Sequence, residues 1–273
     1  MSFSDIESSV ERGEPVELYL FRYGDKPDQY YAYTDAEKPI TRNLITHRPI
    51  PIKRSAIVMT GTQDRAALTV NMAAFAEVPE LYRVHSPSSV VWLEIYQGHA
   101  NDAEHEFIQC WYGRALSCRW KGREAILTCE PMSTGLKRPG LRRNYQIGCP
   151  LVLYDPRTCR ASKAAATVTA TVQSLDGALV QLSVSASAQH AGGMIEWVQP
   201  NGRNETRTIV GVPGGAYLLS GFPVGLSVGM EVSVVRGCDH TLVGCQSHDN
   251  VPNYGGQPWI PIVNPMSSIS PFK

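Results

Sequence analysis

The sequence predicts a mainly β protein, with two small antiparallel β-barrel or sandwich-like domains and an irregular C-terminal segment. Apolar side chains recur at every second position in short runs, such as Val16, Leu18 and Leu20. Turn-forming residues separate these runs at modest spacing. Hydrophobic residues make up 43% and charged residues 18% of the 273 positions. That is enough apolar material for a core and too little charge for a disordered chain.

The first domain, residues 1–145, is expected to consist of short antiparallel strands. Its opening strand alternates apolar positions with period two and has aromatic neighbours. Later candidates are short aliphatic and aromatic runs between turn residues. The expected strands cover residues 16–23, 30–34, 50–52, 68–72, 90–96, 109–112 and 125–129.

A loop and a second, smaller β domain are expected to follow. Prolines disfavour regular strand pairing in residues 146–163, so we expect a loop there with one helical turn. The second β domain is expected over residues 164–236, with hairpin turns at Gly192-Gly193 and Asn201-Gly202. Residues 237–273 are rich in Gly, Pro and Asn and are expected to be irregular. The expected strands cover residues 166–172, 179–184, 195–198, 207–210 and 231–235.

Composition argues against several function classes. The formal net charge is zero, so specific recognition of nucleic acid is not expected. The sequence has no run of about 18 apolar residues, so we expect no transmembrane segment. The chain starts with acidic and polar residues, which is unlike a signal peptide. We therefore expect synthesis in the cytoplasm, where thiols stay reduced.

Catalytic motifs give no support to an enzyme. The sequence contains no zinc-protease motif, phosphate-binding loop or dinucleotide fingerprint. The pairs Asp239-His240 and His248-Asp249 are adjacent in sequence, and neighbouring side chains often point apart. We expect no enzymatic activity.

The seven cysteines divide by context. Three lie in or beside strand-like runs and are expected to be interior thiols: Cys110, Cys118 and Cys129. Four lie in irregular segments as two pairs: Cys149 with Cys159, and Cys238 with Cys245. A glycine precedes the first member of each pair and would let the backbone turn closely around a bound object. Since an antiparallel domain can return its end close to its beginning, the four sulfur atoms could converge.

Four converging thiolates would suit either tetrahedral zinc or an iron–sulfur cluster. Nine residues separate the two cysteines of the first pair, and six separate those of the second. Both spacings are wider than the two to four residues usual between paired ligands of a single zinc ion. A larger cluster suits wide spacing better, although the ferredoxin spacing is absent as well. From spacing alone, a metal site and four unconnected cysteines remain equal alternatives.

The C-terminal residues carry a specific resemblance. Residues 148–159 read G-C-P-L-x-x-Y-D-x-x-x-C, and after Cys238 and Cys245 comes Asn250-Val-x-Asn-Tyr-Gly-Gly256. This combination resembles a family of phage tail-tip proteins that includes the lambda-like minor tail protein L and the hub protein of gene transfer agents. The resemblance covers roughly residues 145–261, and the first 140 residues match only in general character.

The resemblance implies a β-barrel hub, usually a homotrimer, that binds a [4Fe–4S] cluster, with zinc as the less favoured alternative. The implied ligands are Cys149, Cys159, Cys238 and Cys245, so residues 146–163 and 237–273 would be the two cluster-binding segments. Other residues would turn the chain beneath the cluster or shield it, although the aromatic ones could equally be ordinary packing residues. These are Asn253, Tyr254, Gly255, Gly256 and Trp259.

The expected function is that of a structural virion protein at the tail tip. The chain would join the tail tube, through a distal tail protein, to a central fibre or spike protein. The alternative is an iron–sulfur or zinc protein with a redox or receptor-binding role.

Overall fold

The computed structural model describes residues 6–8, 13–24, 27–58, 67–84, 86–102, 106–137, 140 and 143–261. The chain divides into two compact units, Met1–Pro139 and Gly140–Lys273. Within the described residues, no helix is long and apolar enough to cross a membrane. The expected mainly β fold class is confirmed, and each unit is described by itself.

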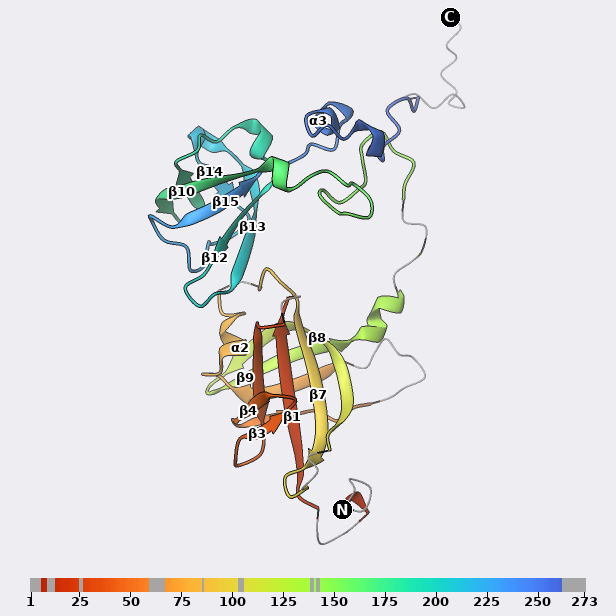
Figure 1. The fold of residues 1–273 in the computed structure, drawn as a ribbon, viewed down its shortest axis with the longest axis vertical. Helices are drawn as coiled ribbons and strands as arrows, with labels where there is room; N and C mark the ends of the chain where they lie inside the picture. Colours follow the sequence, from red (N-terminus) through yellow and green to blue (C-terminus); the bar gives the residue numbers. More distant parts are fainter. Residues whose placement is uncertain are drawn as a thin grey trace, which may run out of the picture. The chain divides into compact units, whose positions relative to one another are not determined.

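The first unit is built on a nine-stranded sheet with the order β3-β4-β2-β1-β7-β8-β9-β6-β5 (Figure 1). Neighbouring strands pair antiparallel, except that β2 and β4 pair in parallel. A short helix, α2 (Glu77–Glu80), follows β6. The strands are β1 (Pro15–Tyr23), β2 (Tyr30–Thr34), β3 (Ile40–Arg42), β4 (Ile45–Pro49), β5 (Ile52–Arg54), β6 (Leu68–Ala73), β7 (Val91–His99), β8 (Ile108–Lys121) and β9 (Glu124–Pro131).

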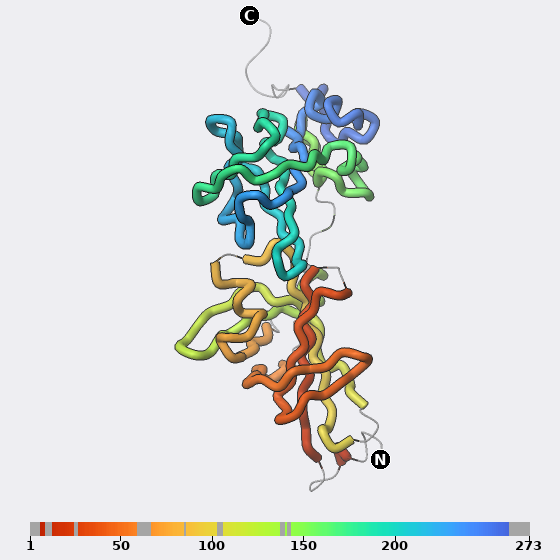
Figure 2. The backbone as a smooth tube through the Cα atoms, turned by 60° about the vertical axis from the view of Figure 1, so that its left-hand side comes forward, coloured from red at the N-terminus to blue at the C-terminus, as the bar shows by residue number. Residues whose placement is uncertain are grey.

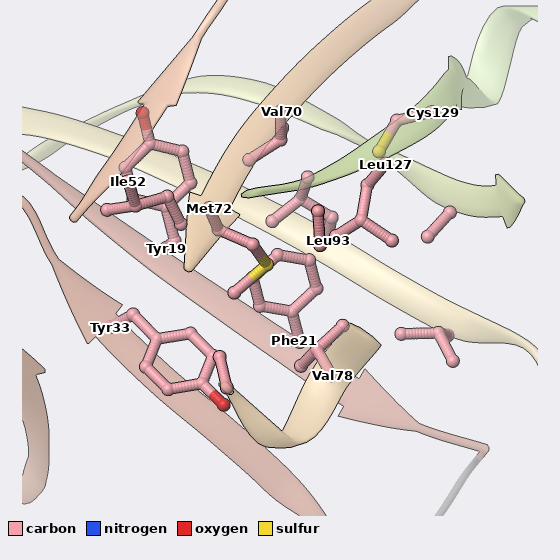
Figure 3. Close-up of a cluster of buried hydrophobic side chains, with 14 of the residues drawn as sticks. Tyr19, Phe21, Tyr33, Ile52, Val70, Met72, Val78, Leu93, Leu127 and Cys129 are labelled. Atoms are coloured by element: carbon pink, nitrogen blue, oxygen red, sulfur yellow. The ribbon is translucent and has the colours of Figure 1, made fainter. Parts of the chain in front are cut away.

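Strand β1 is buried on both of its faces, which explains its nearly continuous apolar sequence. Tyr19 and Phe21 point into the main core (Figure 3), whereas Leu18 and Leu20 belong to a smaller apolar cluster. Successive side chains of a strand point to opposite faces, so both clusters draw on one strand. Burying one such large side chain contributes about 1.5–3 kcal/mol, and β1 therefore anchors the unit.

The second unit contains a closed barrel with the strand order β10-β11-β14-β13-β12-β15. Its core includes Trp197 and Tyr217, and closure leaves no unpaired sheet edge in the barrel. Three helices flank the barrel: the 3-10 turn η2 (Ala164–Ala166) before it, and α3 (Leu242–Gln246) and η5 (Val251–Asn253) after it. The strands are β10 (Thr167–Asp176), β11 (Leu179–Leu182), β12 (Met194–Val198), β13 (Asn204–Gly211), β14 (Tyr217–Leu219) and β15 (Glu231–Val235).

Several local expectations were wrong. No described residue between 145 and 163 is helical, and the first helical turn after this segment is η2. The expected strand over 50–52 is displaced to β5, and β3, β4 and β14 were not expected. Asn201-Gly202 does join the antiparallel pair β12 and β13.

Gly192-Gly193 is not a hairpin turn, because β11 pairs with β10 and β14 rather than with β12. A Cβ atom on Gly193 would lie 2.1 Å from the Val235 carbonyl oxygen. The close approach of these two backbone segments is therefore the reason for glycine at position 193.

Candidate cysteine cluster site

The barrel brings together the two segments that carry the four cysteines. Strands β10 and β15 pair antiparallel, with Thr167 at the start of β10 opposite Val235 at the end of β15. The chain before β10 and the chain after β15 therefore leave the barrel at the same end. Figures 1 and 2 show the earlier segment beside α3 and the residues that surround it.

Hydrogen bonds hold the two segments against each other. The Cys149 amide donates to the His240 carbonyl at 2.8 Å, and the Gln257 amide donates to the Gln146 carbonyl at 2.8 Å. The Tyr154 hydroxyl donates to the Arg236 carbonyl at 2.5 Å. These contacts join residues about 80 to 110 positions apart in the sequence, so the segments are fixed by tertiary contacts rather than by a β-sheet.

Helix α3 presents Cys245, and local polar groups fix where this helix begins. The Thr241 hydroxyl accepts a hydrogen bond from the Gly244 amide at 3.0 Å, which caps the N-terminus. That hydroxyl donates in turn to the Asp239 carboxylate at 2.8 Å. The sequence between Cys238 and Cys245 therefore folds into a capped turn that returns the second cysteine toward the first segment.

Three of the four sulfur atoms accept hydrogen bonds from N–H groups. The Gly255 amide lies 3.4 Å from Cys149 Sγ, and the His240 amide lies 3.4 Å from Cys238 Sγ. Asn250 Nδ2 lies 3.5 Å from Cys159 Sγ. Such donors stabilise negative charge on sulfur, as a thiolate ligand requires.

The four cysteines of the second unit lie near enough to influence one another electrostatically. Burial raises the pKa of Cys238 and Cys245 above their usual values, and the neighbouring cysteines raise both further. For Cys245, the neighbours that act are Cys238, Cys149 and Cys159. All four are free thiols. Each would therefore release a proton when it binds a metal.

The donor set fits soft-metal chemistry, since thiolates favour zinc and iron–sulfur clusters over hard cations. Among the described residues, no three or more His, Cys, Asp or Glu side chains are grouped closely enough to hold a single metal ion. Four thiolates as a donor set are compatible with zinc or with an iron–sulfur cluster.

Three glycines beside the cysteines allow close packing of the backbone. A Cβ atom on Gly237 would lie 1.9 Å from the Ala191 carbonyl oxygen, so this glycine serves backbone packing at the barrel end. A Cβ atom on Gly256 would lie 2.4 Å from the Ile147 carbonyl oxygen. Gly256 thus lets the C-terminal segment lie directly against the first cysteine segment, and Gly255 packs beside Leu151.

The two aromatic residues expected to shield the site lie in different surroundings. Tyr254 donates a hydrogen bond to the Ile147 carbonyl at 2.7 Å and is partly buried. The side chain of Trp259 is 89% exposed. Asn253 donates to the Asn250 side chain at 2.7 Å, so it supports the site through another residue.

Sequence reasoning missed three residues that join the two segments. Asn250 is buried and contacts Cys159, and Tyr154 contacts Arg236. The ring of His248 lies edge-on to the Tyr154 ring, with centroids 5.7 Å apart. The motifs contained Asn250 and Tyr154, but no spacing rule assigned them a contact.

The remaining cysteines belong to the first unit. Cys129 is fully buried in the main core, and Cys110 and Cys118 pack against that core. Burial raises the pKa of the Cys129 thiol to about 12. These thiols are therefore protonated at neutral pH, as interior thiols are.

Comparisons with known proteins found a family match over part of the chain and a similar solved structure. Residues 188–264 match a family described as "Phage conserved hypothetical protein BR0599", a stretch that includes Cys238 and Cys245. No curated protein matches the chain. A chain of the solved structure "Virion of native gene transfer agent (GTA) particle" is similar, with a TM-score of 0.76 and 15% identity over 98% of this chain and 96% of that chain. At this identity the likeness establishes the fold alone.

Proposed function

We propose that this protein is a structural component of a phage or phage-like particle, acting as the hub of the tail tip. The observation that carries the proposal is the likeness of nearly the whole chain to a chain of a gene transfer agent virion. The phage family match over residues 188–264 supports the same assignment independently. The role is structural rather than catalytic, and it places the protein between the tail tube and a central fibre or spike.

The second part of the proposal is that Cys149, Cys159, Cys238 and Cys245 hold a [4Fe–4S] cluster. Its support is the convergence of four thiols and the N–H groups that face three of the sulfur atoms. When bound, the cluster would add iron–sulfur bonds to the hydrogen bonds that already join the two segments. Zinc would connect the same segments but fits the wide spacing less well.

A metal group that joins the two cysteine segments would stabilise the second unit of a structural protein. Cys159 and Cys238 lie on either side of the barrel, so a shared group closes a loop over the whole second domain. Closing a long loop reduces the freedom of the unfolded chain and so favours the folded state. The protein's own residues would orient the ligands through α3 and the C-terminal segment.

The proposed partners are two further copies of this chain, a distal tail protein and the central fibre or spike protein. A homotrimer forms a closed ring, which matches the general preference of oligomers for cyclic symmetry. The ring would surround the channel at the end of the tube.

Immunogold labelling of purified particles tests the location, with antibodies raised against the full chain. Label at the tail end distal to the head is the expected result, and label against the major capsid protein serves as the positive control. Particles that assemble and infect without the chain would overturn the proposal. Complementation with Cys245→Ser and with Cys118→Ser then compares a proposed ligand with an interior thiol.

A further inference from the structure

Asn250 is a buried polar residue between the two cysteine segments, with 5% of its surface exposed. Its side-chain nitrogen donates a hydrogen bond to the Cys159 carbonyl oxygen at 2.6 Å. The same nitrogen lies 3.5 Å from Cys159 Sγ. Asn250 thus reaches both the backbone and the sulfur of a cysteine 91 positions earlier in the chain.

The other polar groups of Asn250 are used as well. Its side-chain oxygen accepts a hydrogen bond from Asn253 at 2.7 Å, which fixes the orientation of the amide group. Its backbone amide donates to the Cys245 carbonyl at 3.1 Å, and its own carbonyl accepts from Cys245 Sγ at 3.2 Å. One residue therefore contacts a cysteine from each segment.

We infer that Asn250 is a positioning residue of the cysteine site, which holds the Cys159 loop against α3 and directs an N–H group at the Cys159 sulfur. The inference deepens the proposed cluster site and rests on it for the function of this contact. The hydrogen bond from Asn250 to Cys159 also holds Cys159 in place when the chain carries no metal.

The chemistry of the amide explains why asparagine suits this position. An amide carries a donor and an acceptor at fixed positions, whereas an ionised aspartate only accepts. Asn250→Asp would place a carboxylate oxygen against the Cys159 carbonyl and sulfur. Asn250→Leu would leave a buried carbonyl without its donor.

The local backbone also requires support. Arg160, which follows Cys159, has φ of 60°, in the left-handed region that a non-glycine residue rarely adopts. Its amide donates to the Asp155 carbonyl at 2.9 Å. Since this turn is intrinsically unfavourable, contacts such as the one from Asn250 are needed to hold it.

The test is the alkylation rate of each cysteine in the full-length, metal-free chain, measured with iodoacetamide and peptide mass spectrometry. We expect Asn250→Asp to raise the rate at Cys159 by about tenfold, as for local opening after loss of a buried hydrogen bond. Cys149 should change much less. Asn204→Asp, the same substitution at an exposed position of β13, is the matched control and should change neither rate.

An unchanged rate at Cys159, or an equal rise at all four cysteines, would overturn the positioning role. If Asn250→Asp fails to fold, Asn253→Ala is the substitute test, because it removes only the side chain that orients the Asn250 side-chain amide. It should raise the rate at Cys159 selectively but less, and equal rates at Cys159 before and after this change would also contradict the role.

Iron loading separates this inference from the proposed function. In the iron-loaded chain, Asn250→Leu should lower the midpoint potential, because an N–H donor to a ligand sulfur stabilises the reduced cluster. An unchanged potential would refute the contact to sulfur. If the wild-type chain binds no iron while Asn250→Asp still exposes Cys159 selectively, the cluster proposal fails and the positioning role stands.

Discussion

The hydroxyl of Tyr254 donates a hydrogen bond to the backbone carbonyl of Ile147, 107 positions earlier in the chain, at 2.7 Å. Beside it, the Gly255 amide faces Cys149 Sγ and the Gln257 amide donates to Gln146. Residues 254–257 thus run along residues 146–149. The C-terminal segment is therefore part of the cysteine site.

Gly256→Ala tests this docking. The added Cβ atom would lie 2.4 Å from the Ile147 carbonyl oxygen. This clash is with backbone, so it can be relieved only if one of the two segments moves. We expect a loss of about 1–3 kcal/mol in the stability of the second unit, measured by thermal or urea unfolding. Gly221→Ala is the control, since a Cβ there meets no atom within 4 Å. Equal stability of the two variants would argue against close docking.

Tyr154→Phe removes the hydroxyl that donates to the Arg236 carbonyl but keeps the ring beside His248. Loss of this hydrogen bond should cost about 1 kcal/mol. Urea unfolding of the metal-free chain measures the effect. The control is Tyr145→Phe, because Tyr145 is largely exposed. A similar loss in both variants would show that the Tyr154 hydroxyl does not join the segments.

Trp259→Ala decides whether this residue shields the site. Because its side chain is 89% exposed, truncation should change the stability of the isolated chain by less than about 0.5 kcal/mol. Metal content should stay the same as in the wild type. A faster loss of metal in air would instead support the shielding role that the sequence suggested.

The pH dependence of the first unit should reflect His47, which is buried in β4. Burial lowers the pKa of His47 below its usual value of 6.5. The unfolded chain then binds a proton more readily than the folded chain, so stability is full above pH 6.5 and falls as pH drops below it. The slope from one group is at most about 1.4 kcal/mol per pH unit.

Melting of wild type and His47→Leu at pH 7.5 and pH 5 checks this dependence. The variant should lose less stability on acidification than the wild type does. His240→Leu, which changes an exposed residue of the second unit, is the control for the first unit's transition. An identical acid response in His47→Leu would assign the dependence to other groups.

Strand periodicity in the sequence was sufficient to predict most of the fold. It located β1, β6, β7 and β9 closely, because their apolar residues alternate or run continuously through a buried layer. Strands β3 and β14 have three residues each, too few to display a period.

The four cysteines of the candidate site could be singled out from the sequence, whereas the residues that contact them could not. The cysteines stood out because they occur in pairs within irregular segments. Asn250 gave no such signal, since its contact with Cys159 depends on how α3 and the following turn place it. Gly237 was assigned to the cysteines, although it packs against Ala191. Tertiary contacts of single residues have no period or spacing that sequence reasoning can detect.

Cys245→Ser and Cys118→Ser together test the division of the cysteines. Cys245 gathers with the other three thiols of the site, whereas Cys118 packs against the core of the first unit. We expect Cys245→Ser to lose bound iron and to destabilise the second unit, while Cys118→Ser keeps its iron. Loss of iron in Cys118→Ser would show that the ligands were assigned to the wrong cysteines.

The measurement that tests the central proposal most directly is the iron and acid-labile sulfide content of the full chain, purified without oxygen. The [4Fe–4S] proposal predicts about four irons and four sulfides per chain, with a broad absorption near about 400 nm. One zinc per chain would keep the link between the segments but replace the cluster. A chain with neither iron nor zinc would contradict the account, and would leave the four cysteines as free thiols at the end of the barrel.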